Sequence, residues 1–129
     1  MIKVSKIHKS FNDKVILNGV DFKINSGECV VIIGKSGSGK SVLLKHLLGL
    51  LRPDKGFVEI DGESINDLNY SQLQQVRSKI GMVFQSGALF DSMTVNDNIY
   101  IALDRLENLN QKDLQKRIND SLKEVGMQD

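Results

Sequence analysis

The chain has 129 residues, of which 40% are hydrophobic and 26% are charged, and this composition is typical of one ordinary globular domain. Its formal net charge of +1 gives no electrostatic reason to expect nucleic acid as a partner, and its single cysteine, Cys29, excludes an internal disulfide. No apolar run approaches the roughly 18 residues of a membrane-spanning helix and the N-terminus shows no signal-peptide pattern, so we expect a cytoplasmic protein.

The first 24 residues predict two strands joined by a turn. Apolar side chains alternate loosely over residues 2–11, and the Asn12-Asp13 dipeptide that follows is typical of a turn. Residues 15–24 are again rich in β-branched and apolar side chains, and they end at a second turn, residues 25–27. We therefore expect a small antiparallel hairpin at the start of the chain.

Residues 34–41 carry the pattern G-x-x-x-x-G-K-S, between an apolar run at 29–33 and the helix-like segment 42–48. That order of buried strand, glycine loop and helix is the context in which the pattern forms a phosphate-binding P-loop. The glycines let the backbone turn so that its amides face one anion, and the helix N-terminus adds a positive end. The alternative, a plain serine-glycine turn before an amphipathic helix, does not account for the flanking strand.

The pattern assigns roles within this loop. Lys40 is placed to reach the β- and γ-phosphates, and the Ser41 hydroxyl is placed to bind Mg²⁺. Lys35 occupies a variable position of the pattern, so we expect it to contribute less than Lys40. The predicted phosphate-binding residues are Gly34, Lys35, Ser36, Gly37, Ser38, Gly39, Lys40 and Ser41.

Beyond the loop, short strands and helices follow one another. Gly49 and Pro53 are expected to end the first helix, and the glycine-bounded alternation of residues 56–62 predicts a short antiparallel strand. A capping box at residues 71–74 predicts a helix that runs to about residue 79. Residues 80–84 are apolar and predict a second buried strand.

Two helices are predicted in the last third of the chain. Thr94 is expected to cap a short helix over residues 95 to about 103. From Asn110 onward, apolar side chains fall on one helical face, and Gly126 is placed to end that helix. This face consists of Leu114, Ile118, Leu122 and Val125.

The order of these motifs resembles the ATP-binding subunits of ABC transporters over essentially the whole chain. The matching elements are Phe11, the P-loop, the GLLRPDKG segment at residues 49–56, and Gln85 at the family's Q-loop. The resemblance implies an α/β fold in which a P-loop NTPase core carries an antiparallel β subdomain, with ATP and Mg²⁺ as cofactors. It also implies that residues 1–129 divide into the β subdomain and core, 1–93, and the start of a helical subdomain, 94–129.

The resemblance assigns further site residues. Phe11 would stack on the adenine face, although tyrosine is more usual at this position and a hairpin phenylalanine in the core is the alternative. Gln85 would help to hold Mg²⁺ and the attacking water, so Lys40 and Gln85 are the candidate catalytic residues and Ser41 and Gln85 the candidate metal ligands. The alternative for Gln85 is a polar residue at the end of a strand.

A narrower resemblance covers residues 84–95, which look like the Q-loop of the Mla-type, MCE-associated phospholipid-transport ATPases. It implies a transmembrane permease that docks on residues 88–90 and Met93, an MCE-type lipid-binding protein as an indirect partner, and a second ATP-binding subunit in a homodimer. The subunit would then be peripheral on the inner face of the cell membrane. In the alternative interpretation, the same side chains fill a junction between subdomains.

Several motifs of the resembled family do not occur in the printed sequence. It has no LSGGQ signature, no histidine after Gln85, and no Walker B strand with its Asp-Glu pair. Residues 58–61 imitate a Walker B strand, but Glu59 interrupts them and they precede the Q-loop. We therefore expect a chain truncated before the signature and Walker B, with an incomplete sheet whose apolar edge is open.

The sequence is compatible with three functions. The first is the energy-coupling part of an ABC transporter, driving phospholipid transport or acting as an importer of another substrate. The second is a nucleotide-binding remnant that does not hydrolyse ATP by itself. The third, a small-molecule kinase, predicts neither the leading hairpin nor a Q-loop, and whether the chain is an enzyme is left undecided.

Overall fold

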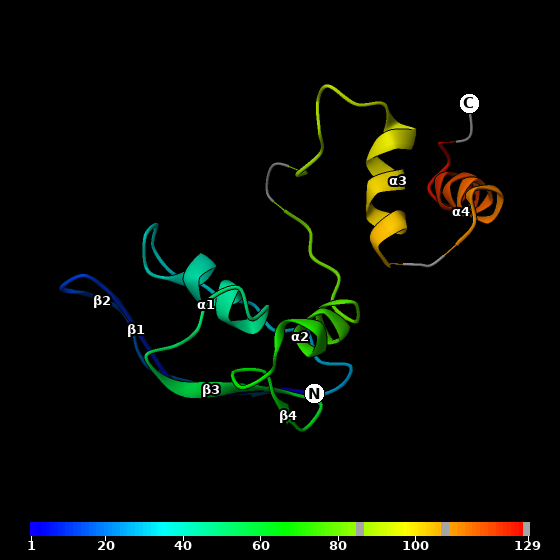
Figure 1. Ribbon diagram of the computed structural model, residues 1–129. Helices are drawn as coiled ribbons and strands as arrows, with labels where there is room; N and C mark the ends of the chain where they lie inside the picture. The colour runs from blue at the N-terminus through cyan, green and yellow to red at the C-terminus, as the bar shows by residue number, and fades with distance from the viewer. Residues whose placement is uncertain (85–86, 107–108, 128–129) are drawn as a thin grey trace. The chain divides into compact units, whose positions relative to one another are not determined.

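The computed structural model describes residues 1–84, 87–106 and 109–127 (Figure 1). The chain forms two compact units, Met1–Gly81 and Met82–Asp129. Each unit is described by itself below.

The first unit is built on a four-stranded antiparallel sheet of order β2-β1-β3-β4. Strands β1 (Ile2–Phe11) and β2 (Lys14–Ile24) form the hairpin that the sequence predicts. Strand β3 (Lys55–Ile60) pairs with the other edge of β1, and the two-residue β4 (Glu63–Ser64) pairs with β3. Strands β1 and β3 are therefore the inner strands of the sheet.

Strand β1 carries a bulge where β3 begins to pair with it. The register slips between Ser5 and His8, and Lys6 adopts a φ of 45°, which a non-glycine residue adopts only under local constraint. The amide of Lys6 donates to Asp21 Oδ2 at 3.0 Å. A Cβ at Gly56 would lie 2.3 Å from the carbonyl oxygens of Ser5 and Lys6, so only glycine allows β3 to approach this close.

Two helices lie over one face of this sheet, α1 (Lys40–Leu47) and α2 (Tyr70–Arg77) (Figure 1). Arg77 ties them together, because its Nε and Nη2 donate to the carbonyl oxygens of Leu48 and Gly49 at 3.0 Å each. These carbonyls close α1, so α2 caps the C-terminal end of its neighbour. The buried core between sheet and helices consists of Val4, Ile7, Leu17, Leu43, Val58, Ile65 and Val76.

The capping box of α2 lies two residues earlier than the sequence predicts. Asn69 is the N-cap: its side chain accepts from the Gln72 amide, and the Gln72 side chain accepts from the Asn69 amide. Ser71 lies inside the first turn, where its backbone is already helical. Asn69 takes the cap because its extended backbone, with ψ of 171°, frees its side chain to reach the third amide of the helix.

The two apolar runs predicted as buried strands form no strand in the part of the chain that the structure describes. Val31 and Ile33 of the first run are 75% and 90% exposed, and Val83 of the second is 96% exposed. A strand that is apolar at every position needs hydrogen-bonded neighbours on its edges and cover on both faces. Neither run has such neighbours among the described residues, so the prediction of two buried strands is wrong for this structure.

The second unit contains two packed helices, α3 (Val95–Leu106) and α4 (Gln111–Glu124). Thr94 starts α3 as predicted, since its Oγ1 accepts from the Asp97 amide at 3.1 Å, although the helix runs three residues past its predicted end. Asn110 caps α4 in the same way.

The predicted apolar face of α4 is confirmed in its first part. Leu114 and Ile118 are buried. Val125 lies past the end of the helix and is 68% exposed, so the prediction that it belongs to this face is wrong. Gly126 follows with a φ of 72° and ends the segment as predicted. Among the described residues, no helix has the length and apolar character needed to cross a bilayer.

Candidate functional site

The glycine loop of residues 34–39 packs closely on β2 before it opens into α1. Gly37 and Gly39 have φ values of 76° and 94°, in the left-handed region that favours glycine. A Cβ at Gly39 would lie 3.0 Å from both Ile16 Cγ2 and Leu17 Cδ2. The loop therefore needs glycine at position 39 for two reasons, its backbone turn and its contact with the sheet.

Lys40 closes this loop on itself. Its Nζ donates to the carbonyl oxygens of Gly34 and Lys35 at 2.7 and 2.9 Å, and the Ser38 amide donates to the Lys35 carbonyl at 3.2 Å. No carboxylate pairs with Lys40 among the described residues. The ammonium group is thus held inside the curve of the loop by neutral oxygens, and its charge is not cancelled by an acid.

The N-terminal end of α1 offers donors to an anion. The N-cap is Gly39, which has no side chain to accept from the first amides of the helix, and the first turn contains no acidic residue. Lys40 and Ser41 are the first residues of the helix, and Ser41 is exposed. Uncapped amides, a helix dipole and a lysine at one point form a site that suits phosphate oxygens.

Lys35, Ser36, Gly37 and Ser38 are exposed around the same loop, so the structure brings all of the predicted phosphate-binding residues from 34 to 41 together. The Ser38 side chain lies directly over Gly34, where a Cβ would be 2.6 Å from Ser38 Oγ. This contact explains a glycine at the first position of the pattern, because any side chain there would displace Ser38.

Phe11 lies at the end of β1 and is 44% exposed, so it is not a residue of the core. Lys9 projects from the same strand two residues earlier, and its Nζ lies 5.6 Å from the centre of the Phe11 ring. Residues two apart on a strand share a face, which explains the pairing. The exposed ring can accept a flat ligand as well as the cation.

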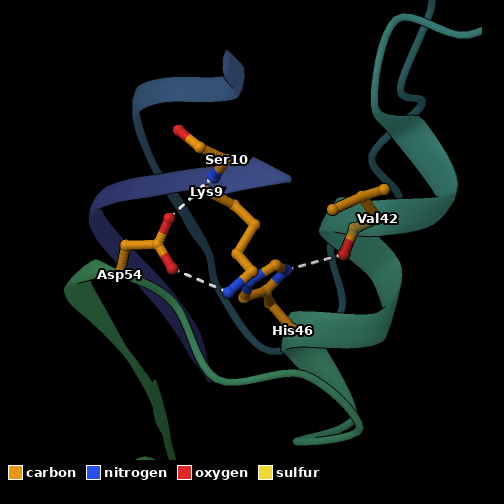
Figure 2. Close-up of polar contacts among 5 residues, drawn as sticks. All are labelled: Lys9, Ser10, Val42, His46 and Asp54. Carbon is orange, nitrogen blue, oxygen red and sulfur yellow. Dashed lines mark hydrogen bonds and ion pairs between the residues drawn. The ribbon is translucent and has the colours of Figure 1, made fainter. Parts of the chain in front are cut away.

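Asp54, which sequence reasoning did not single out, organises the end of β1 (Figure 2). Its Oδ1 accepts from Lys9 Nζ and its Oδ2 from the Ser10 amide, both at 2.7 Å, while its own amide donates to the His8 carbonyl at 2.9 Å. Hydrogen bonds from Lys9 and the Ser10 amide, together with the positive charge of Lys9, lower the pKa of Asp54. The sequence signal that could have pointed to Asp54 is its position directly after Pro53, in the turn between helix and sheet.

His46 lies on the core side of α1 and is only 1% exposed. Its Nδ1 is 2.7 Å from the Val42 carbonyl, and because a carbonyl only accepts, this nitrogen carries the proton (Figure 2). Its Nε2 is buried without a hydrogen-bond partner among the described residues. The ring therefore fills the space between helix and sheet at the cost of one unpaired acceptor.

Gln85 lies outside the described residues, so its predicted role stays a prediction. Beyond it, Leu89, Phe90 and Met93 are 69%, 54% and 42% exposed. Asn98 of α3 holds this segment, because its Oδ1 accepts from the Phe90 amide at 2.7 Å and its Nδ2 donates to the Phe90 and Thr94 carbonyls. Sequence reasoning missed Asn98, whose contacts reach back eight residues along the chain.

A family model described as ABC transporter matches residues 17–129. The chloroplastic protein TRIGALACTOSYLDIACYLGLYCEROL 3 of Arabidopsis thaliana is 42% identical over 131 residues, covering 98% of this chain and 36% of that protein. The probable ribonucleotide transport ATP-binding protein mkl of Mycobacterium leprae is 38% identical over 126 residues, covering 98% and 36%. The methionine import ATP-binding protein MetN of Legionella pneumophila is 38% identical over 129 residues, covering 100% and 38%.

Solved structures match the same span. A dimeric bacterial ABC transporter cassette superposes with a TM-score of 0.83 at 34% identity, and a dimeric post-hydrolysis ATP-binding cassette bound to ADP and Pi superposes at 0.82 and 33%. In both, the match covers 98% of this chain and 57% of the other, and the chain spans 36% to 38% of the curated relatives. With its P-loop and antiparallel sheet in place, the chain belongs to the ATP-binding subunits of the ABC transporter family.

Proposed function

We propose that this chain binds Mg-ATP and forms the nucleotide-binding part of an energy-coupling subunit of an ABC transporter. The observation that carries the proposal is the loop of residues 34–41. Glycine turns, uncapped helix amides and a lysine bonded only to carbonyl oxygens lie together there. The family binds ATP, and the cassette that superposes on this chain was solved with ADP and Pi.

Binding of phosphate would exchange the partners of Lys40. In the described loop its ammonium is satisfied by the Gly34 and Lys35 carbonyls, and a triphosphate would offer charged oxygens in their place. A charged acceptor makes a stronger hydrogen bond than a neutral carbonyl, so the exchange favours the nucleotide. Phe11 would meet the adenine at the end of β1.

Mg²⁺ fits the residues at the start of α1. The exposed Ser41 hydroxyl is a hard oxygen ligand beside the phosphate position, and Mg²⁺ typically takes one or two protein oxygens together with phosphates and water. When bound beside Ser41, the ion would offset the negative charge of the phosphates. Gln85 is proposed as a further ligand and a positioning residue for water.

A second candidate function is nucleotide binding without turnover by the chain itself. It is favoured by the printed sequence, in which no Asp-Glu pair ends an apolar strand after the P-loop. Hydrolysis of Mg-ATP by the purified 129-residue chain, lost in Lys40→Ala, would contradict this candidate and support an active ATPase.

We further propose phospholipid transport as the process served. One similar protein is named for a glycolipid, trigalactosyldiacylglycerol, while two others are named for ribonucleotide transport and methionine import. The proposed partners are a permease docked on the segment after Gln85, an MCE-type lipid-binding protein in the same assembly, and a second ATP-binding subunit. Import of another substrate is the alternative, and it requires the permease but no lipid-binding protein.

Calorimetric titration of the chain with Mg-ATP tests nucleotide binding. Lys40→Ala is expected to weaken binding at least about tenfold, since a charge-assisted hydrogen bond to phosphate contributes ~1.5–3 kcal/mol. Lys35→Ala is the matched control, because it removes an exposed lysine of the same loop, and it is expected to weaken binding less than about threefold. Equal losses in the two variants would argue against the assigned phosphate site.

A further inference from the structure

Strand β1 extends beyond its neighbour β3 at the end that carries Phe11. The pairing of β1 with β3 reaches His8, opposite Lys55, which is the first residue of β3. The other edge of β1 stays paired with β2 up to Phe11. The last residues of β1 therefore have a strand on one side and no ladder on the other.

Asp54 makes the hydrogen bonds that a neighbouring strand would otherwise make to this end of β1. It directly precedes β3, its amide donates to the His8 carbonyl at 2.9 Å, and its Oδ2 accepts from the Ser10 amide at 2.7 Å. One residue thus satisfies the acceptor and the donor that β3 would have paired had it started earlier. Without this carboxylate, the Ser10 amide would lose its partner and the end of β1 would fray.

The same carboxylate sets the position of Lys9. Its Oδ1 accepts from Lys9 Nζ at 2.7 Å, and the Lys9 side chain is only 17% exposed. Held there, the ammonium lies 5.6 Å from the centre of the Phe11 ring. A flat ligand would then stack on the ring face that the cation does not cover.

The connection from α1 to Asp54 is itself fixed. The amides of Leu50 and Leu51 both donate to the Lys45 carbonyl, at 2.8 and 3.2 Å, and Arg77 holds the Leu48 and Gly49 carbonyls. The helix that starts at the phosphate loop therefore leads, through a constrained return, to the residue that orders the strand end carrying Phe11.

We infer that Asp54 is a positioning residue for recognition of the nucleotide base: through the Ser10 amide and Lys9 it holds the Phe11 ring in place for a purine. The inference rests on the proposed binding of ATP. It assigns Asp54 no contact with the phosphates, so loss of its carboxylate should weaken ligands that carry a base and spare ligands that do not.

The test compares two ligands, Mg-ATP and Mg-tripolyphosphate, by calorimetry on the 129-residue chain. Asp54→Ala is expected to weaken binding of ATP about fivefold or more, because the ring on which the base stacks is no longer held, and to change binding of tripolyphosphate less than about twofold. Phe11→Ala should show the same pattern, and the Phe11→Ala/Asp54→Ala double variant should bind ATP no more weakly than Phe11→Ala alone.

Asp54→Asn provides a second variant in case the alanine variant does not fold. It keeps an acceptor for the Ser10 amide and loses the charge that holds Lys9, so an intermediate loss for ATP is expected. The matched control is Asp67→Ala, which removes an exposed acid of the same unit whose Oδ2 lies 3.5 Å from Ser64 Oγ. This control should bind both ligands as the unaltered chain does.

Amide exchange gives a readout that needs no ligand. Exchange at Ser10 should accelerate in Asp54→Ala and stay unchanged in Asp67→Ala. Equal losses of affinity for ATP and tripolyphosphate, or additive losses in the double variant, would overturn the inferred role of Asp54 and leave the proposed function standing. Failure of the unaltered chain to bind either ligand, or binding that does not depend on Lys40, would instead contradict the proposed function.

Discussion

Lys40 illustrates what single residues contribute to this site. The motif predicts that its ammonium meets phosphate, and the structure shows the amine held by the Gly34 and Lys35 carbonyls at 2.7 and 2.9 Å. Those carbonyls keep the side chain folded over the loop, so little rotamer freedom remains to be lost when phosphate replaces them. The loop is thus preorganised around its lysine.

Three exposed carboxylates give the first unit an acid-sensitive stability. The pKa of Glu28 is lowered by hydrogen bonds from Asn25, that of Asp54 by Lys9 and the Ser10 amide, and that of Asp61 by the N-terminal amine. Because each folded pKa lies below its unfolded value, the contribution is complete above about pH 5 and is lost as pH falls through the folded pKa.

Urea unfolding at about pH 6 and pH 3 measures this loss. The unfolding midpoint of the unaltered chain should fall on acidification, and Asp54→Asn should fall by less, because it has no carboxylate to protonate at this position. Asp67→Asn serves as the control and should follow the unaltered chain. An Asp54→Asn midpoint that drops as steeply as that of the unaltered chain would contradict the assignment.

At the scale of elements, the predictions that rested on local sequence signals are confirmed, and those that needed distant partner strands are not. The β1–β2 hairpin and helices α3 and α4 form where turn residues, caps and apolar spacing predict them. The runs at 29–33 and 80–84 have equally apolar sequences, and they form no strand in the described part of the chain. A hairpin supplies its own partner within a few residues, whereas a buried parallel strand depends on partners from elsewhere.

The cap of α2 gives a prediction at this scale. Asn69→Ala should lower the free energy of unfolding by about 1 kcal/mol, since it removes the side-chain acceptor for the Gln72 amide. Ser71→Ala, the residue that the sequence pattern favoured, should change stability by less than about 0.5 kcal/mol, because Ser71 is exposed within the first turn. Chemical denaturation measures the stability of both variants. A larger loss in Ser71→Ala than in Asn69→Ala would contradict Asn69 as the N-cap and favour Ser71.

At the scale of the whole molecule, two groups of exposed apolar side chains among the described residues differ in kind. The unpaired runs expose Val31, Ile33 and Val83, which would be covered by strands. In the second unit, Leu89 and Phe90 are exposed although Asn98 binds the backbone of the segment at both Phe90 and Thr94. Apolar side chains presented on an anchored backbone suit a partner surface, which supports docking of the permease at this segment.

Leu89→Ala with Phe90→Ala is expected to weaken association with the permease by about tenfold or more, since each buried large apolar side chain at an interface contributes ~1.5–3 kcal/mol. ATP binding should be unchanged. Val125→Ala is the matched control, because Val125 is an apolar residue of the same unit with 68% exposure against 69% for Leu89. A quantitative pull-down with the permease measures the effect, and unchanged capture of the double variant would remove the docking proposal.

The sequence by itself determined the glycine loop that opens α1, most of the helices and the hairpin, because each depends on residues close together in the chain. It also predicted that Gly39 and Lys40 act together on phosphate, since the pattern contains both. Only the tertiary structure decided that Asp54 completes the ladder of β1 and holds Lys9 beside Phe11, from more than forty positions away. Which amides a sheet leaves unpaired follows from where its strands end, and that depends on packing between distant segments.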